Sequence, residues 1–498
     1  MKLVRELQRM LIHSYYAKLL AVKKVTTNKG KKTPGIDNIK WETDESKFEG
    51  IESLNSNNSY TPKPLRRVHI KKANGKLRPL GIPTMKDRAM QTLHVKALDP
   101  VIETTADRNS YGFRKGRSCA DAREQIFIIL SRRNCAQWIL EGDIKGCFDN
   151  ISHQWLLDNI PMDKQILEKF LKSGYVLNKK LFPTKAGTPQ GGAISACLSN
   201  AVLDGLEKHI QSTFGIRYCP EAKCRKSRKV NFIRYADDFI VTADNKETIE
   251  KIKDMVKKYL IERGLELSDE KTLITNIQEG FDFLGWNIKK YKHKLIIKPS
   301  NKSVQRIVRR LSDVIKENKA SSQDSLILKL NQIITGWSNY HQISVSKRVF
   351  QKIDSLIFQM LWKWATRRHP NKGKKWIKER YWKIENNRKW VFKDTAKLKL
   401  MSDKKIIRHI PLKTSQNPYI DVEYFAKRKF TLGARKLSGT LKQVWKNQKG
   451  KCGICGTMMD IAEERDIIKK PGTENIEWKP SNIIMTHKWC NSYTPIEK

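Results

Sequence analysis

Two adjacent carboxylates set between apolar segments are the feature that most constrains this chain. Residues Asn231–Ala243 read Asn-Phe-Ile-Arg-Tyr-Ala-Asp-Asp-Phe-Ile-Val-Thr-Ala. The apolar and β-branched flanks predict two strands joined by a tight turn. Successive side chains of a strand point to opposite faces, so Asp237 and Asp238 can act together only near such a turn.

Carboxylates this close repel each other, and burying them unpaired would cost several kcal/mol. A bound divalent cation relieves that cost, and oxygen ligands suit Mg²⁺. The alternative is an ordinary acidic turn that faces solvent. The apolar flanks and the strongly basic remainder of the chain favour the metal site.

A third carboxylate follows another apolar run. In Trp138–Asp149 the apolar residues lead into Asp143, and a helix is predicted to begin near Asn150. A two-metal centre, which clamps the attacking and leaving oxygens of a phosphoryl displacement, needs such a ligand from a separate segment. Asp149 is more simply interpreted as a helix cap.

The composition predicts a polyanionic partner. The chain has 498 residues, enough for about three domains. It carries 98 Lys and Arg against 51 Asp and Glu, a net charge of +47, and such an excess attracts nucleic acid. A membrane surface would also attract positive charge. However, no run approaches 18 apolar residues and the N-terminus lacks a signal-peptide apolar segment, so we expect an intracellular site of action.

The nine cysteines suit a reducing compartment, because their number is odd and they form no framework of regular spacings. Most are interpreted as buried or loop thiols, and the pair Cys219 and Cys224 has no ligand-like residues nearby.

The first half of the chain alternates helices with basic turns. Apolar spacing predicts a helix over residues 3–24, and a Gly/Pro-punctuated basic loop follows over residues 28–37. Asn74-Gly75 is a hairpin signal between two basic segments. The hairpin forms a finger that can grip phosphates through Lys76 and Arg78.

Further helices and glycine loops are predicted between residues 86 and 271. A helix is predicted over residues 86–104, and Tyr111–Arg117 is a second basic glycine loop. The glycines of Ala186–Ala193 allow the backbone to approach a substrate closely. After a charged amphipathic helix over residues 247–263, Lys271 is either a phosphate contact or an exposed lysine.

The region beyond residue 300 combines apolar stripes with basic faces. Helical spacing predicts three helices, over residues 301–318, 326–337 and 349–361, whose stripes form a core. The basic faces are either solvated surface or a track for an RNA backbone, and the overall charge favours the track. Residues 371–435 are basic and rich in Trp and Tyr, which suits contact with nucleic acid.

The C-terminal segment carries two ligand pairs. Cys452-Gly-Ile-Cys455 and His487-Lys-Trp-Cys490 have the spacing of a tetrahedral Zn²⁺ site. Zinc is favoured over four free side chains, because a small module needs such a staple.

The order of these motifs resembles the reverse transcriptase of group II intron-encoded proteins. Seven blocks over residues 25–290 carry the resemblance: Thr33-Pro-Gly-Ile-Asp37, Lys76-Leu-Arg-Pro-Leu-Gly-Ile-Pro83, Gly112-Phe-Arg-Lys-Gly116, Gly142-Asp-Ile-Lys-Gly-Cys-Phe-Asp149, Gly187-Thr-Pro-Gln-Gly191, Tyr235-Ala-Asp-Asp238 and Phe283-Leu-Gly-Trp286. Gly336-Trp-Ser-Asn-Tyr340 and Trp364–Pro370 resemble the thumb, or X domain, of group II maturases.

The resemblance implies an α+β fold with right-hand polymerase fingers and palm, an α-helical thumb and a small zinc-bound module similar to an HNH endonuclease. It implies that Asp143, Asp237 and Asp238 hold Mg²⁺, and that Phe148 lies under the incoming sugar and excludes a 2′-hydroxyl. Gln190 would line the nucleotide site. The triphosphate or template would meet three basic side chains: Lys76, Arg78 and Lys271.

The HNH-like module departs from the family pattern. The family has two adjacent histidines ahead of a central asparagine and a histidine after the last cysteine. Here the corresponding stretch is Glu464-Arg-Asp-Ile-Ile-Lys469, and Asn491 follows Cys490. Asn482 remains, but the general base and a catalytic metal ligand are missing. We therefore predict a module that folds around zinc and binds DNA or RNA without cleaving it.

These inferences give a domain plan: fingers and palm in 1–295, the maturase thumb in 296–390, a basic DNA-binding or linker region in 391–440 and the zinc module in 441–498. The predicted function is RNA-dependent DNA synthesis with maturase activity on the host intron. The alternative is an RNA-binding splicing cofactor whose polymerase is idle. A plain zinc-dependent nuclease is disfavoured by the missing histidines.

The expected partners are group II intron RNA, a DNA target or primer and dNTPs, with no membrane. The oligomeric state is open, a dimer included. The expected location is a bacterial cytoplasm or an organelle, plastid or mitochondrion.

Overall fold

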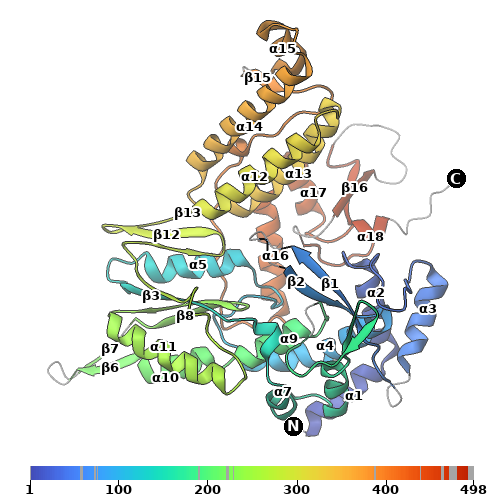
Figure 1. Cartoon of the computed structure of the whole chain (residues 1–498), viewed down its shortest axis with the longest axis vertical. Coiled ribbons are helices and arrows are strands. Elements are labelled where there is room, and N and C mark those ends of the chain that lie inside the picture. The colour runs from blue at the N-terminus through green and yellow to red at the C-terminus, as the bar shows by residue number, and fades with distance from the viewer. Residues whose placement is uncertain are drawn as a thin grey trace. The chain divides into compact units, whose positions relative to one another are not determined.

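The computed structural model describes residues 2–55, 60–71, 75, 77–188, 191–219, 224–227, 229–385, 388–437, 439–460, 465–469 and 479–491. The chain forms two compact units (Figure 1). The first unit combines residues 1–118, 139–274 and 412–498, and the second combines residues 119–138 and 275–411. No helix in the described ranges has the length and apolar character needed to cross a bilayer.

The N-terminal part of the first unit is helical. The helix predicted over residues 3–24 is wrong as a single element, because it divides at Ser14, whose backbone is extended (φ −62°, ψ 128°). The helices and the 3₁₀ turn of this part are α1 (Lys2–His13), α2 (Tyr15–Thr27), α3 (Asp44–Glu52), η1 (Ser53–Asn55) and α4 (Met85–Thr105). The last of these confirms the helix predicted over residues 86–104.

A four-stranded sheet follows, in the order β2-β1-β4-β5. Its strands are β1 (Leu65–Lys71), β2 (Leu77–Ile82), β4 (Tyr175–Leu177) and β5 (Lys180–Phe182). The predicted basic hairpin is confirmed: β1 and β2 are antiparallel, with Arg66 opposite Ile82 and Lys71 opposite Leu77. Of its turn, only Gly75 lies among the described residues.

The second sheet of this unit holds the acidic residues and has the order β10-β3-β9-β8. Its strands are β3 (Trp138–Asp143), β8 (Asn231–Tyr235), β9 (Asp238–Ala243) and β10 (Leu273–Asn276). Helices α10 (Leu206–Phe214) and α11 (Lys246–Ile261) contact β8 and β9 respectively. Both strands are almost wholly buried away from the turn that joins them.

The remaining elements of residues 139–230 connect these two sheets. They are α6 (Cys147–Asn150), α7 (His153–Asn159), α8 (Lys164–Leu171), α9 (Ser195–Leu203) and the antiparallel pair β6 (Ile216–Cys219) and β7 (Cys224–Ser227).

The second unit is built around a helical bundle, drawn in yellow to orange in Figure 1. Its elements are α5 (Cys119–Leu130), β11 (Phe281–Phe283), β12 (Trp286–Tyr291), β13 (Lys294–Pro299), α12 (Asn301–Glu317), α13 (Gln323–His341), α14 (Lys347–Arg368), α15 (Lys374–Tyr381), β14 (Trp382–Glu385), β15 (Arg388–Phe392) and η2 (Met401–Asp403). The three predicted apolar stripes are confirmed as core, since α12, α13 and α14 bury Leu311, Leu330 and Ile357 in one cluster.

The C-terminal part of the first unit is a small module with its own core. Its elements are α16 (Val422–Lys436), α17 (Gly439–Asn447), β16 (Arg465–Lys469), β17 (Ile483–His487) and α18 (Lys488–Asn491). The fully buried indole of Trp445 lies at the centre of this core, and its Nε1 donates to the Phe430 carbonyl at 2.9 Å.

Candidate functional site

The acidic turn lies where two strands of the second sheet meet. Tyr235 at the end of β8 pairs with Asp238 at the start of β9, so Ala236 and Asp237 form the turn between them. This confirms the predicted pair of strands and the tight turn. Strand β3 is the neighbour of β9 and ends at Asp143. The chain therefore brings carboxylates from two distant segments to one place.

The close packing of β3 on β9 requires a residue without a side chain. A Cβ atom added to Gly142 would lie 2.1 Å from Cζ of Phe239, well inside van der Waals contact. The buried ring of Phe239 therefore lies directly on the backbone that precedes Asp143. Any larger residue at position 142 would force the Phe239 ring or the β3 backbone to move.

The carboxylates share an excess of negative charge. Loss of solvent, followed by the charges of Asp237 and Asp143, raises the pKa of Asp238 to about 6. Loss of solvent also raises the pKa of Asp237, with Asp143 adding to the effect. Raised carboxyl pKa values of this origin indicate a site that a cation would stabilise.

Two basic side chains partly balance this charge. Lys271 Nζ donates to Asp143 Oδ2 at 2.7 Å while its side chain stays 64% exposed. The segment that carries it is held to β3, because Ser268 N donates to the Asp143 carbonyl at 2.8 Å. The charge of Arg78, on exposed β2, lowers the pKa of Asp237. Lys271 and Arg78 thus act on the carboxylates themselves.

The residues predicted around a nucleotide are only partly described. Phe148 lies on α6, half-buried, with its ring 6.4 Å from that of Phe113. The glycine loop is pinned beside it, because Thr188 N donates to the Phe148 carbonyl at 2.6 Å. Lys76 and Gln190 lie outside the described residues.

One sequence interpretation changes at this site. Asp149 lies within α6, whose N-cap position is Gly146, so its interpretation as a helix cap is wrong. The second basic glycine loop keeps its arginine side chains internal, whereas Phe113, Lys115 and Gly116 are exposed. Arg114 forms a buried pair with Glu103 (Nη2 to Oε1, 2.6 Å), and Arg117 is 2% exposed and donates to the Arg108 carbonyl. These two guanidinium groups hold the loop rather than face a ligand.

The sequence reasoning passed over a buried arginine beside the acidic turn. Arg234 has no exposed surface, and its Nη2 lies 2.5 Å from Asp204 Oδ1. The signal was present, since a charged residue stands alone in the apolar flank of the turn. A buried arginine needs a partner, but Asp204 is 30 residues away in the chain and no local pattern links the two.

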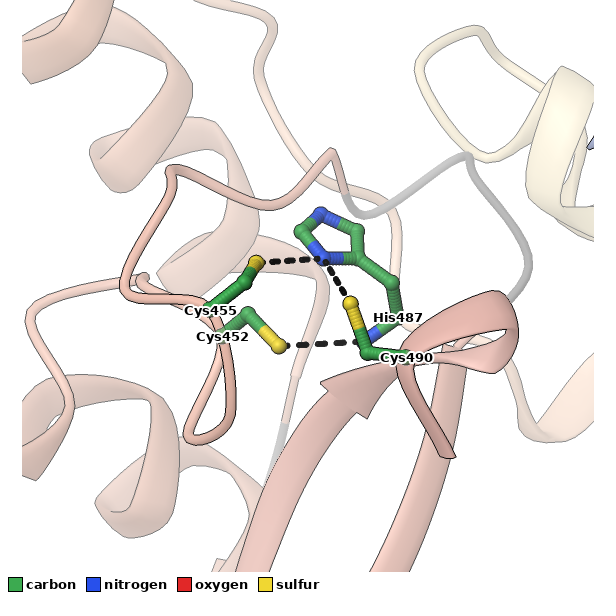
Figure 2. A group of neighbouring side chains, drawn as sticks. All are labelled: Cys452, Cys455, His487 and Cys490. Carbon is green, nitrogen blue, oxygen red and sulfur yellow. Dashed lines mark hydrogen bonds between the residues drawn. The ribbon is translucent and has the colours of Figure 1, made fainter. Parts of the chain in front are cut away.

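The second cluster lies in the C-terminal module (Figure 2). The four predicted ligands Cys452, Cys455, His487 and Cys490 come together, with their ligand atoms all within 4.8 Å of one another. Nδ1 of His487 lies 3.5 Å from Sγ of Cys455 and 3.7 Å from Sγ of Cys490. Two of the ligands come from the loop before β16, and two from the end of β17 and from α18.

Backbone donors orient this cluster. The amides of Ile454 and His487 point at Sγ of Cys452, at 3.5 and 3.4 Å. Such contacts stabilise a thiolate, which is the form that binds metal. Three sulfur atoms and one imidazole nitrogen in this arrangement fit a closed structural zinc site. The oxygen ligands of the acidic turn, by contrast, fit a hard cation such as Mg²⁺.

Three family models match the chain. The model for reverse transcriptase (RNA-dependent DNA polymerase) matches residues 70–288. The model for the group II intron maturase-specific domain matches residues 304–382, and the model for the N-terminal domain of reverse transcriptase matches residues 1–54. Together the models match residues in both units of the chain.

Two relatives show how much of the chain is shared with known proteins. The group II intron-encoded protein LtrA of Lactococcus lactis subsp. cremoris is 32% identical over 328 residues, which cover 54% of this chain and 54% of LtrA. The chain thus spans about half the length of that relative. Protein YkfC of Escherichia coli K12 is 30% identical over 343 residues, 61% of this chain and 86% of YkfC. A solved telomerase structure from Candida albicans covers 65% of each chain at 12% identity, but its TM-score of 0.37 is too low to support an argument.

The Cys3His cluster predicts one bound zinc. We expect the purified protein to contain about one zinc per chain, measured by plasma mass spectrometry. Cys490→Ser should lose most of it, because a hydroxyl is a poor substitute for a thiolate ligand. Cys119→Ser, which changes a half-buried cysteine remote in sequence from the cluster, is the matched control and should keep full zinc. Equal zinc in both variants would contradict the assignment.

Proposed function

The chain belongs to the group II intron-encoded reverse transcriptase and maturase family, and on that premise we propose that it copies RNA into DNA and assists the splicing of its host intron. The carboxylates of Asp143, Asp237 and Asp238, at the adjoining ends of β3 and β9, are the observation that carries the proposal.

We propose that these three carboxylates hold Mg²⁺. Their oxygen atoms are hard ligands. Burial, together with the charge of the neighbouring carboxylates, raises the pKa values of Asp237 and Asp238, and a cation would relieve this cost. When bound, magnesium supplies positive charge that stabilises the phosphoryl oxygens of an in-line displacement. The contribution of the chain is to keep the three carboxylates together on a rigid sheet.

The basic residues around the turn would then bind the triphosphate or the template. Lys271 can exchange Asp143 for a phosphate oxygen, because its side chain is long and mostly exposed. Arg78 and Lys76, on the β1–β2 hairpin, would contact the template or the triphosphate. Phe148 would lie under the sugar and exclude a 2′-hydroxyl, and Gln190 would line the base pocket.

The domain plan of the family remains our proposal for the whole chain. Fingers and palm would occupy 1–295, the thumb 296–390, a DNA-binding or linker region 391–440 and the zinc module 441–498. The match of the maturase-specific model to residues 304–382 supports the position of the thumb. The activity would take place where the intron is transcribed, in a bacterial cytoplasm or an organelle.

The maturase function would use the basic face of α12. The apolar side chains of this helix enter the core of the bundle, whereas Arg306, Arg309, Arg310 and Lys316 are exposed. A row of cations on one face of a rigid helix suits the phosphates of an RNA backbone. We propose the host intron RNA as the ligand of this face.

The C-terminal module would bind nucleic acid around its zinc without cutting it. The four proposed zinc ligands come together, and the histidines that would carry nuclease chemistry in this family are missing from the sequence, although Asn482 remains. The stretch that lacks the paired histidines contributes β16, which pairs with β17 along Arg465–Lys469. A structural role for this strand requires no histidine.

The polymerase proposal predicts the loss of DNA synthesis in Asp237→Ala. We expect primer extension on an RNA template to fall at least ~100-fold, because one metal ligand is worth several kcal/mol in the transition state. Binding of intron RNA should be unchanged. Asp254→Ala, an exposed carboxylate on α11, is the matched control. No extension by the unmutated protein would leave only the splicing-cofactor alternative, and equal loss of RNA binding would show that the turn supports the RNA-binding fold.

The maturase proposal predicts a change in salt dependence. Replacing Arg306, Arg309 and Arg310 by Ala should weaken intron RNA binding and reduce the slope of log K against log salt by about two to three. Replacing three exposed lysines of α11, namely Lys246, Lys251 and Lys258, removes the same charge from another surface. If both triple variants lose the same slope, the effect comes from net charge alone and the α12 face is not the binding site.

The module proposal predicts no DNA cleavage. Supercoiled plasmid and a linear duplex should stay intact with the zinc-loaded protein in either Mg²⁺ or Mn²⁺, because no general base is available. Gel shifts with the same duplex should nevertheless show binding. Nicking that persists in Asp237→Ala would overturn the proposal, since it could not arise from the polymerase carboxylates.

A further inference from the structure

The turn that carries Asp237 and Asp238 is strained. Ala236 adopts a positive φ of 58°, which residues with a Cβ atom rarely occupy. Such conformations cost about 1–3 kcal/mol and persist only where the surroundings determine them. A two-residue turn makes few contacts of its own, so the residues around Ala236 must hold it in this conformation.

A neighbouring backbone segment lies directly against the turn. Tyr111 N donates to the Arg234 carbonyl and Arg234 N donates to the Asn109 carbonyl, both at 2.9 Å. One residue further, a Cβ added to Gly112 would lie only 2.3 Å from the backbone N of Ala236. The segment is therefore hydrogen-bonded to the last residues of β8 and packs on the turn itself.

One buried amide joins this segment to the arginine behind the turn. Asn200, on α9, donates from Nδ2 to the Gly112 carbonyl at 2.9 Å and accepts at Oδ1 from Nη1 of Arg234 at 3.1 Å. The carbonyl can only accept and the guanidinium can only donate, so the amide has one possible orientation. Nη1 of Arg234 also lies 3.4 Å from the carbonyl oxygen of Ala236.

Water cannot replace a lost hydrogen-bond partner of Asn200 or Arg234, because both side chains are buried. Arg234 is completely buried and Asn200 is 5% exposed. The other arm of the guanidinium is fixed by Asp204, at 2.5 Å. Removing Asn200 would leave a buried carbonyl and a buried N–H without their partner, so the contacts around the turn would have to rearrange.

We propose that Asn200 and Arg234 are positioning residues that hold the Tyr235–Asp238 turn in the geometry that binds the catalytic metal. This inference rests on the proposed polymerase function. The two side chains touch no substrate; they act on the backbone at Gly112 and Ala236, and through it on the carboxylates. Asn200 and Arg234 thus resemble the residues that surround and orient the ligands of a metal site. Loss of one such residue typically lowers metal affinity or activity by about 10–100-fold.

If Asn200 only stabilised the fold, its loss would affect melting temperature but not metal binding. A substitution at Tyr259 distinguishes this role from the positioning role. The hydroxyl of Tyr259, on α11, donates to the Asp204 carbonyl at 2.8 Å. Tyr259→Phe therefore removes one hydrogen bond from the same buried network but none from the turn. Asn200→Ala and Tyr259→Phe should both lower the melting temperature, whereas only the first should alter the metal site.

The test measures metal binding and catalysis on the full chain. Mn²⁺ binding is followed by electron paramagnetic resonance, and the relevant site is the one that Asp237→Ala removes. For Asn200→Ala we expect Mn²⁺ affinity and the kcat of primer extension to fall ~10–100-fold, with the KM for dNTP within about 3-fold of the unmutated value because no nucleotide contact is lost. Tyr259→Phe should keep both.

A second variant guards against misfolding. Asn200→Asp has the same size and still accepts from Arg234, but it cannot donate to the Gly112 carbonyl, and it should weaken Mn²⁺ binding in the same direction. Unchanged Mn²⁺ affinity in both Asn200 variants would overturn the proposal, as would an equal loss in Tyr259→Phe. If neither Asn200 variant folds, the network serves the fold as a whole and the proposal also fails.

The outcomes for the two proposals can be told apart. An unmutated protein that binds Mn²⁺ through Asp237 but extends no primer would refute the polymerase function, while the Mn²⁺ measurements would still decide the role of Asn200. An unmutated protein without an Asp237-dependent Mn²⁺ site would refute the positioning role directly.

Discussion

Repulsion between carboxylates is the constraint on which the first unit depends. Asp143, Asp237 and Asp238 share one end of the second sheet, and loss of solvent together with their mutual repulsion raises the pKa values of the last two. An arrangement of this kind opposes folding unless the backbone around it is rigid and positive charge lies within reach. Gly142 permits the close strand packing, and Lys271 and Arg78 supply the charge. The strands thus hold the three carboxylates together against their mutual repulsion.

Positive charge in this chain serves two different purposes. Arg114, Arg117 and Arg234 are buried and bind carbonyl or carboxylate oxygens inside the first unit. The arginines on the outer face of α12 have no such burial. The net charge of +47 therefore overstates the charge available to a polyanion, because part of it is spent on internal contacts. Composition alone cannot separate these two groups, since burial is a property of the fold.

The parts of the fold that depend on local pattern were predictable from the sequence. The hairpin around Gly75, the helix that became α4 and the apolar stripes of α12 to α14 follow from residue spacing and turn residues, and the structure confirms them. The division of the first helix at Ser14 was not predicted, because apolar spacing continues across it. The link from Asn200 to Gly112 and Arg234 was equally out of reach, since it joins residues 88 and 34 positions apart. The residues of the acidic turn and of the Cys3His cluster could be identified from the sequence, but their supporting contacts could not.

The C-terminal module is linked to the acidic turn through an intervening loop. The segment that leads to the Cys3His cluster packs on α4 and on the loop of residues 111–117. The hydroxyl of Tyr419 donates to Asp99 of α4, and Lys115 of the loop lies 4.3 Å from the centre of the Tyr419 ring. A Cβ added to Gly116 would lie 2.6 Å from the ring of Phe425. The same loop begins at the residues that contact Arg234 and Ala236. The C-terminal module is therefore connected to the acidic turn, because the segment that anchors it also packs on the loop behind that turn.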